Sequence, residues 1–230
     1  MTLNELTYSI FETIRSEISD DDNIDIRQIR DDIHKQRALW LRNELNKNRT
    51  IHPDIQQDLG CVDMELTDNA ECCEITTGCN ILRSVEILPR PLELHNKEAI
   101  TRVGPVNKMN KPFSLVPYER AIYSGNGKFN YNKIFAFYLN WRIYITGKDP
   151  IINTIEKIHV RGVFENPEEA GKFVDCDNKP CFTADSEYPI MEWLRPYIET
   201  EIIKKYIPQY NYPSDAGNDN NDRMQQNIVQ

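Results

Sequence analysis

Cysteine is the residue type in this chain that most directly suggests chemistry, because thiolates bind zinc and act as nucleophiles. The 230-residue sequence contains six cysteines. Structural zinc sites usually use pairs with about two to four residues between them. Only Cys176 and Cys181 have this spacing, and Cys72, Cys73 and Cys79 supply no second suitable pair. We interpret the cysteines as reduced, mostly buried thiols, with a cysteine-rich zinc site as the alternative.

The histidines and glycines form no catalytic signature either. His34 falls on a helical pattern as a packed or half-exposed side chain, and His159 falls in a strand, where we expect it to face solvent. Residues 125–128 (Gly-Asn-Gly-Lys) lack the spacing of a phosphate-binding loop and predict a hairpin turn. We therefore expect no catalytic residues, no metal ligands and no cofactor, and hence no enzyme.

The elements that would position a functional surface begin with a helical segment over residues 1–48. Apolar residues recur every three or four positions from Leu3 to Ile18 and again from Ile24 to Asn48. The acidic run 19–23 interrupts the pattern and offers helix caps. Two helices joined by a short turn predict a helical hairpin.

The pattern changes over residues 49–165, where apolar residues alternate as in strands. Short connections favour an antiparallel sheet or small barrel over parallel β-α-β units. The alternation over Ile134–Thr146 is long for one strand, so a hairpin that turns near Asn140 is the alternative. The other strands are expected at 61–66, 81–87, 99–103 and 155–164.

Helices return over residues 166–207. Asn166 followed by Pro167 predicts a capped helix start, and Pro196 should kink the last helix or shift its start. The apolar stripe of that helix consists of Ile190, Leu194, Ile198, Ile202 and Tyr206. Residues 208–230 are mostly polar, so we expect a disordered tail that becomes ordered on a partner. The predicted fold class is therefore α+β.

Charge and hydropathy restrict the partners. The net charge of −9 argues against general binding to nucleic acid and against docking on an anionic membrane. No apolar run is long enough to span a bilayer, and the first residues do not resemble a secretion signal. These features predict a cytoplasmic origin.

Tryptophans at the margins of the two apolar stripes suggest where a protein partner would bind. Trp40 and Trp193 are aromatic residues of the kind that is enriched in protein interfaces. Simple core packing is the alternative for both of them. The interface residues that we expect are Trp40, Trp193, Tyr206, Tyr210 and Tyr212.

The order of the segments and several short stretches resemble head-to-tail connector proteins of podovirus-like tailed bacteriophages, in particular the ring proteins of crAss-like phages. The stretches are Leu3–Leu6, Ile24–Arg27, Arg37–Arg42, Gln57–Leu66, Glu71–Cys73 with Ile81–Ser84, and Lys133–Phe137. They are spread over most of residues 1–165, and none is a catalytic signature.

This resemblance implies a structural protein of the virion neck or tail that is assembled in the host cytoplasm. It implies a ring of twelve copies between the portal protein and an adjacent ring or tail protein. DNA would pass through the channel of such a ring without being bound. A net negative charge suits that conduit, because adsorption to the wall would slow DNA ejection.

Two other classes of protein remain as alternatives at this point. The first is a non-viral acidic adaptor that recruits its partner through residues 208–230. The second is a cysteine-dependent hydrolase or a zinc protein, which bound metal or one unusually reactive thiol would indicate.

Overall fold

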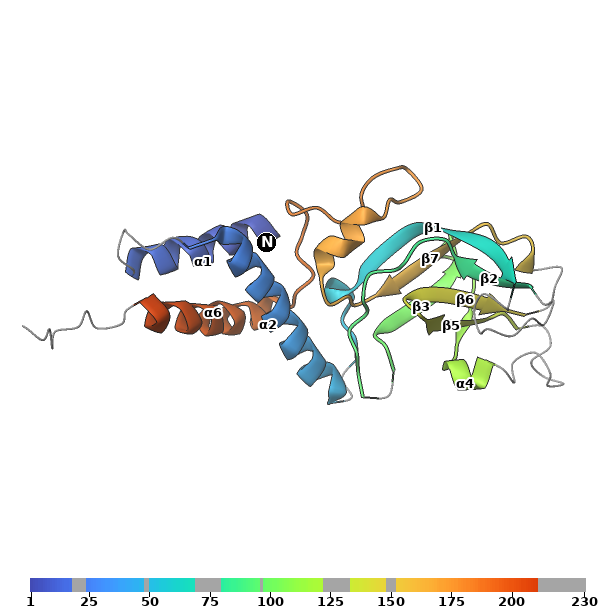
Figure 1. The fold of residues 1–230 in the computed structure, drawn as a ribbon, viewed down its shortest axis with the longest axis horizontal. Coiled ribbons are helices and arrows are strands. Elements are labelled where there is room, and N and C mark those ends of the chain that lie inside the picture. Colours follow the sequence, from blue (N-terminus) through green and yellow to red (C-terminus); the bar gives the residue numbers. More distant parts are fainter. Residues whose placement is uncertain are drawn as a thin grey trace, which may run out of the picture.

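The computed structural model places helices at one end of an elongated molecule and a curved sheet at the other (Figure 1). This arrangement confirms the predicted α+β class. Several predicted features lie outside the described residues: the acidic turn at 19–23, the glycine turn at 125–128, Cys72, Cys73, Cys79 and most of the polar tail. The structure describes residues 1–17, 24–47, 50–68, 80–95, 97–121, 133–147 and 152–210.

Three helices pack together at the helical end. They are α1 (Leu3–Glu17), α2 (Ile26–Asn46) and α6 (Arg195–Tyr210). The Asp25 side chain accepts a hydrogen bond from the backbone N–H of Arg27 and so caps α2. The predicted apolar stripes are buried: Leu3, Leu6, Ile10 and Ile14 of α1, Ile29, Ile33, Leu41 and Leu45 of α2, and Ile198, Ile202 and Tyr206 of α6.

The last helix begins at Arg195, one residue before Pro196, as expected when proline shifts a helix start. A short 3-10 helix, η3 (Glu192–Leu194), precedes it, so Ile190 lies before the helix. The predicted cap at Asn166 is present, because its side chain accepts from the Glu168 N–H. It begins a 3-10 helix, η2 (Pro167–Lys172).

The sheet has seven strands in the order β3-β7-β1-β2-β6-β5-β4. All pairs are antiparallel except β4 with β5. The Phe113 N–H donates to the Val103 carbonyl and draws the two edges together, so the sheet is nearly closed into a barrel. Its strands are β1 (Gln57–Asp68), β2 (Asn80–Ser84), β3 (Ile100–Pro105), β4 (Ser114–Leu115), β5 (Phe135–Leu139), β6 (Arg142–Thr146) and β7 (Lys157–Gly162). Two short helices complete the described elements: η1 (Pro53–Ile55) and α4 (Tyr118–Ala121).

The long alternating segment is a hairpin, which was the alternative considered from its length. Asn140 and Trp141 form the two-residue turn between β5 and β6, and both have positive φ angles, 49° and 62°. A two-residue turn pairs odd with even positions, so Phe137 lies opposite Tyr144. The apolar odd positions of the two strands therefore lie on opposite faces of the sheet, and not on one face.

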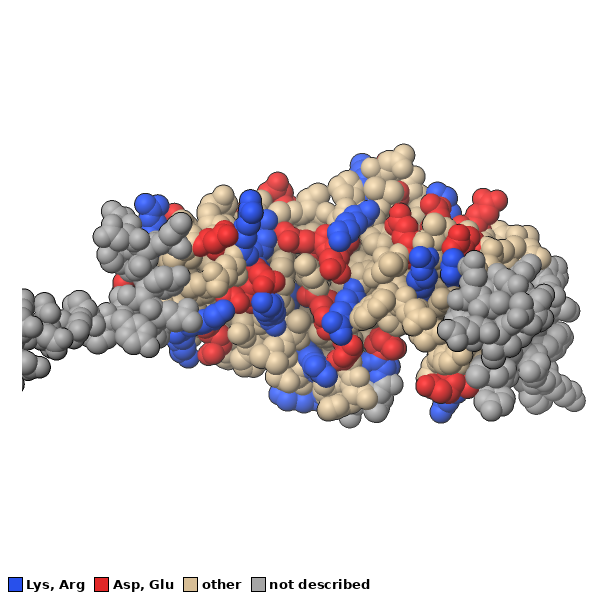
Figure 2. Space-filling view, viewed as in Figure 1, with Lys and Arg blue, Asp and Glu red and all other residues tan. Residues whose placement is uncertain are grey.

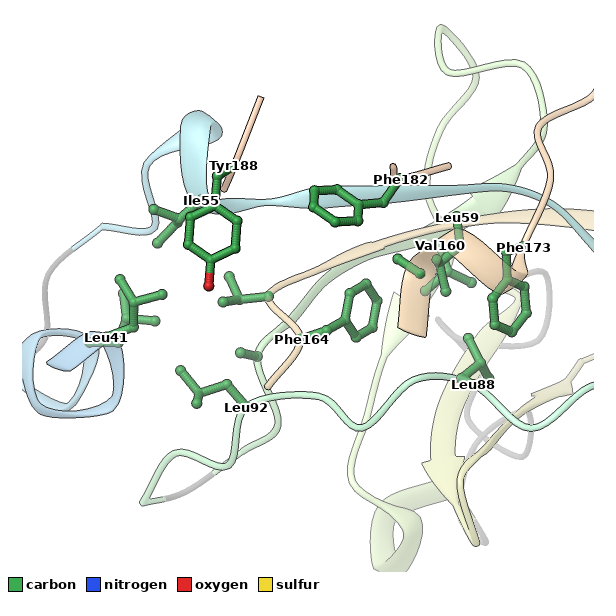
Figure 3. Packing of buried hydrophobic residues seen from close by; sticks show 14 of the residues in the cluster. Leu41, Ile55, Leu59, Leu88, Leu92, Val160, Phe164, Phe173, Phe182 and Tyr188 are labelled. Carbon is green, nitrogen blue, oxygen red and sulfur yellow. The ribbon is translucent and has the colours of Figure 1, made fainter. Parts of the chain in front are cut away.

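The hydrophobic core is continuous between the helices and the sheet. Figure 3 shows Leu41 of α2 facing Leu92 and Ile55 beside the barrel. Phe164, which follows β7, is buried in the same cluster. Because one core serves both parts, the helical end is fixed against the barrel.

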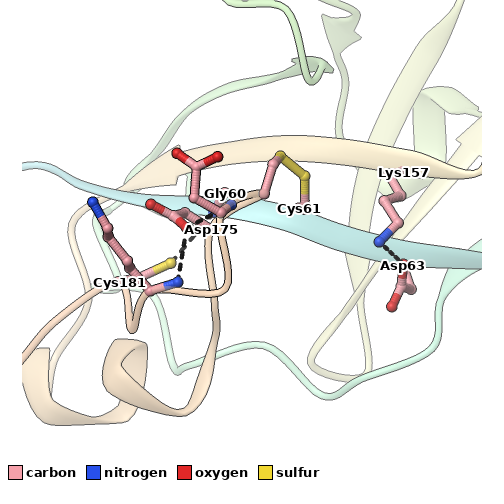
Figure 4. The surroundings of a disulfide bond; sticks show 9 residues. Gly60, Cys61, Asp63, Lys157, Asp175 and Cys181 are labelled. Atoms are coloured by element: carbon pink, nitrogen blue, oxygen red, sulfur yellow. Dashed lines mark hydrogen bonds and ion pairs between the residues drawn. A yellow bond between two sulfur atoms is a disulfide. The ribbon is translucent and has the colours of Figure 1, made fainter.

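Two expectations about side chains on the sheet are wrong. His159 is 1% exposed and not turned to solvent, because Asp58 of β1 lies 3.2 Å from its Nε2 atom and Lys108 reaches the same carboxylate across this face. Cys61 and Cys176 are not reduced thiols but a disulfide, with Cα atoms 5.2 Å apart (Figure 4).

The disulfide depends on a glycine next to it in β1. The pairing of β1 with β7 shifts register between Leu59 and Val62, as at a bulge. A Cβ added to Gly60 would lie 2.6 Å from the Cα of Asp175. Only glycine therefore lets the loop that carries Cys176 approach the strand closely enough for the two sulfurs to bond.

Candidate interaction surface

Two of the predicted interface residues lie on one surface of the helical end. The ring of Trp40 on α2 lies 5.6 Å from the ring of Tyr197 on α6, measured between centroids. The ring of Trp193 on η3 lies 6.2 Å from the same tyrosine ring. We call Trp40, Trp193 and Tyr197 the aromatic surface.

Tyr197 links the two tryptophans, and the sequence pattern did not single it out. It lies four positions after Trp193, the spacing that places residues on one side of a helix, and this was the available signal. Trp193 and Tyr197 are 46% and 52% exposed, whereas Trp40 is half-buried and packs against the core. Trp40 thus attaches the aromatic surface to the core, while Trp193 and Tyr197 remain accessible to a partner.

Local contacts hold the exposed rings in place. The Trp193 indole Nε1–H donates to the Met191 sulfur at 3.2 Å. Next to the rings, Arg195 Nε donates to Glu199 Oε1 at 2.8 Å on α6. Amphipathic rings that are fixed in position and surrounded by charged groups are typical of protein-binding sites.

The other predicted interface residues are not part of this surface. Tyr206 is 1% exposed, and its hydroxyl donates to Asp32 Oδ2 at 2.7 Å, so it belongs to the core and its placement in an interface is wrong. The physical reason is that Tyr206 continues the buried stripe of α6 and Asp32 satisfies its hydroxyl. Tyr210 ends α6, but its side chain lies outside the described part of the chain, as does Tyr212.

A buried arginine joins the helices that carry the aromatic surface to the barrel. The fully buried Arg37 of α2 donates to the carbonyl oxygens of Pro189 at 2.6 Å and Phe164 at 2.8 Å, and more weakly to that of Ile55 at 3.5 Å. Burial lowers the pKa of this guanidinium from its usual value. These three acceptors come from three segments, so Arg37 fixes their relative positions.

His34 lies one turn before Arg37 in the same buried layer. Its Nδ1 atom is 2.9 Å from the Tyr188 hydroxyl, and its Nε2 atom is 3.5 Å from a Glu168 carboxylate oxygen. Burial, and secondarily the charge of Arg37, lowers the pKa of His34 to about 4. The imidazole is therefore neutral at pH 7 and serves as a structural hydrogen-bonding group.

Two further ionisable groups of the described residues have pKa values that their surroundings shift. Burial raises the pKa of the Cys181 thiol, so the thiolate that a nucleophile needs is scarce at neutral pH. Burial alone would raise the pKa of Asp58, but hydrogen bonds from His159, Arg161 and Lys108 lower it well below its usual range. Among the residues that the structure describes, no three His, Cys, Asp or Glu side chains are grouped as metal ligands.

Charged side chains of both signs are interspersed over the face that Figure 2 shows. The arrangement of the whole site, with exposed aromatic rings on a rigid helical layer, can bind another protein surface.

Among the described residues, no helix has the length and apolar character needed to cross a membrane.

No curated protein matches the chain. The family model described as phage tail ring protein 2 matches residues 5–227, which is nearly the whole chain. The resemblance to crAss-like phage ring proteins is thereby confirmed, and the chain belongs to the phage tail ring protein 2 family.

Proposed function

We propose that this phage tail protein forms a ring between the portal and the tail, extends the DNA channel and provides a docking surface for the next tail component. Family membership supports the structural role in a phage tail over the acidic-adaptor alternative. The proposed ring contains twelve copies, and its partners are the portal protein and an adjacent ring or tail protein. Heterologous contacts repeated around an axis close into a ring when the rotation per subunit is right.

The observation that carries the proposal is the aromatic surface. Trp193 and Tyr197 remain about half exposed although the helices beneath them are fully packed. Such rings gain binding energy when a partner covers them, because they are already held in position and lose little side-chain entropy. We assign this surface to the contact with a neighbouring copy or with the portal.

The double substitution Trp193→Ala and Tyr197→Ala tests the assignment. Removing two central aromatic side chains typically weakens an interface by about 30-fold or more. We expect this loss in ring formation, measured by native mass spectrometry over a concentration series with and without the portal protein of the same phage. The masses in the same spectra would also show any bound metal, which the zinc-protein alternative requires.

Tyr8→Ala is the matched control, because Tyr8 is 53% exposed on α1 and lies outside the aromatic surface. It should leave assembly unchanged. A double variant that is folded and forms rings as readily as the unmodified chain would remove the aromatic surface from the interface. A chain that remains monomeric with and without the portal protein would contradict the ring itself.

A further inference from the structure

A loop at one end of the barrel presents an unusually exposed apolar side chain. The loop joins β3 to β4 and spans residues 106–113, which we call the methionine loop. Met109 at its tip is 93% exposed, more than any other large apolar residue that the structure describes. Lys111, two positions later, is exposed and has no ion-pair partner among the described residues.

Hydrogen bonds from a side chain of β3 stabilise the conformation of this loop. Arg102 Nη2 donates to the carbonyl oxygens of Lys108 at 2.8 Å and Asn110 at 3.0 Å, the two residues on either side of the tip. Lys108 Nζ also lies 2.6 Å from an oxygen of Asp58 on β1. The loop is therefore ordered within the monomer. Because its backbone is already fixed, little further conformational entropy is lost when Met109 binds a partner.

A groove lies elsewhere on the barrel, beside the hairpin of β5 and β6. Its volume is about 870 Å³, and we call it the hairpin groove. Trp141 at its margin has a positive φ angle of 62°, a conformation that bulky residues rarely adopt and that often marks a binding site. The groove is lined mainly by Leu115, Val116, Tyr118, Tyr138, Leu139 and Trp141.

The groove is negatively charged at its rim. Three lining residues are acidic, namely Glu93, Glu98 and Glu119, whereas Lys97 is the one basic residue in the lining. Glu98 and Glu119 have no ion-pair partner in the described part of the chain. An aromatic groove with an acidic rim fits an apolar side chain accompanied by a cation.

Trp141, at the margin of the groove, already contacts one cation of the same chain. The guanidinium of Arg90 lies 5.0 Å from the centre of the Trp141 ring, and its Nη2 atom is 3.1 Å from Glu93. The Tyr138 hydroxyl is buried without a hydrogen-bond partner among the described residues. The groove therefore has, at its margin, an aromatic ring that contacts a cation, and it also has a hydroxyl donor that is not yet used.

We propose that the methionine loop of one copy inserts into the hairpin groove of the next copy. Met109 would pack on the aromatic rings, since thioethers make favourable contacts with aromatic side chains. Lys111 would meet Glu98 or Glu119 at the rim. This inference rests on the ring function proposed above and adds a contact between neighbouring copies at the barrel.

The two surfaces are placed so that neither blocks the other within one chain. Ile100, the first residue of β3, lines the groove, and Pro105, the last, leads into the loop. The strand separates these residues by about 16 Å. The loop and the groove thus lie at opposite ends of β3 as two different surfaces, and a head-to-tail contact requires two different surfaces.

Photocrosslinking from the loop tip tests the contact directly. p-Benzoylphenylalanine at position 109 is incorporated into the full chain, and isotopically labelled and unlabelled chains are mixed under ring-forming conditions. We expect cross-links between labelled and unlabelled chains that map to Tyr118, Tyr138 or Trp141. Cross-links between chains that map outside the groove, or none in assembled rings, would overturn the proposal.

A charge exchange provides a second, independent test. Lys111→Glu and Glu98→Lys should each weaken self-association by roughly fivefold to tenfold, and the combined variant should recover to within about threefold. Lys172→Glu makes the same charge change on an exposed residue of η2 and should have no effect. Equal losses from Lys111→Glu and Lys172→Glu, or no recovery in the combined variant, would exclude the pairing.

The outcomes separate this contact from the ring function itself. Rings that form normally in all of these variants, and also in Met109→Asp, would overturn the loop contact and leave the ring function intact. A chain that never self-associates, even with the portal protein present, contradicts both.

Discussion

At the scale of single residues, the buried layer around Arg37 decides how the helical end sits on the barrel. A buried guanidinium is costly unless its N–H groups are satisfied, and here three carbonyl oxygens from different segments satisfy them. Removing the side chain would leave those buried carbonyls without a donor. The arginine thus makes one geometry of the three segments much more stable than the alternatives.

His34 makes the stability of this layer depend on pH. Its pKa is about 4 in the folded protein and near 6.5 when the chain is unfolded. Between these values the unfolded chain binds more protons than the folded one, so stability falls as the pH falls from 6.5 toward 4. We expect a loss of about 3 kcal/mol over this interval, measured by urea unfolding at each pH.

His34→Gln should remove most of this loss, whereas His52→Gln, at an exposed histidine, should leave it unchanged. An unaltered pH dependence in His34→Gln would show that another group is responsible. The low pKa of Asp58 also favours the folded state, but that contribution is lost only at pH values below about 4.

At the scale of elements, the β5–β6 hairpin combines a tight turn with an unsuitable residue. Two-residue turns of this type need positive φ angles at both positions, and asparagine tolerates this far better than tryptophan. Contacts of the Trp141 ring with Arg90 and Tyr138 compensate for the strain. The hairpin therefore holds an aromatic ring at the groove at some cost to its own stability.

Comparing Trp141→Ala with Trp141→Gly isolates the backbone strain, since both remove the ring. We expect the glycine variant to be more stable by about 1 kcal/mol, because glycine adopts a positive φ without steric cost. This reverses the usual order of alanine and glycine within regular structure. Urea unfolding of the two variants measures the difference, and an alanine variant of equal or greater stability would contradict the strain.

Elements with a regular pattern were predictable from the sequence, and contacts between distant segments were not. The helices followed from apolar spacing, and the shifted start of α6 followed from Pro196. Strand β4, by contrast, has two residues and no pattern of its own. The buried position of Arg37 was not predictable, because only the folded chain shows that carbonyl groups of distant segments surround it.

At the scale of the whole molecule, the disulfide ties the loop after η2 to the sheet. Cys61 and Cys176 are 115 residues apart in the sequence, so the bond restricts the unfolded chain strongly. The spacing of the cysteines favoured reduced thiols and offered only Cys176 with Cys181 as a local pair, because spacing in the sequence does not reveal a distant partner such as Cys61. Trp40 and Trp193 were identified correctly as neighbours of the two stripes, but their meeting through Tyr197 required the packing of α2 on α6.

Replacing both bonded cysteines, Cys61→Ser with Cys176→Ser, should lower the free energy of unfolding by about 3 kcal/mol in the absence of reductant. With reductant present, the variant and the unmodified chain should have nearly equal stability. Cys181→Ser is the control, because this thiol is outside the bond. Equal stability of the double variant and the unmodified chain without reductant would show that the bond contributes little.

The packing of α1 against α6 also constrains the order of events during synthesis. The apolar side of α1 is covered by a helix that begins at Arg195, so about 190 residues must be translated before its partner exists. At about 5–20 residues per second, the ribosome needs roughly 10 s or more for this stretch. During that time Leu3, Leu6, Ile10 and Ile14 have no α6 to cover them, and exposed apolar side chains of this kind are what chaperones recognise on a nascent chain.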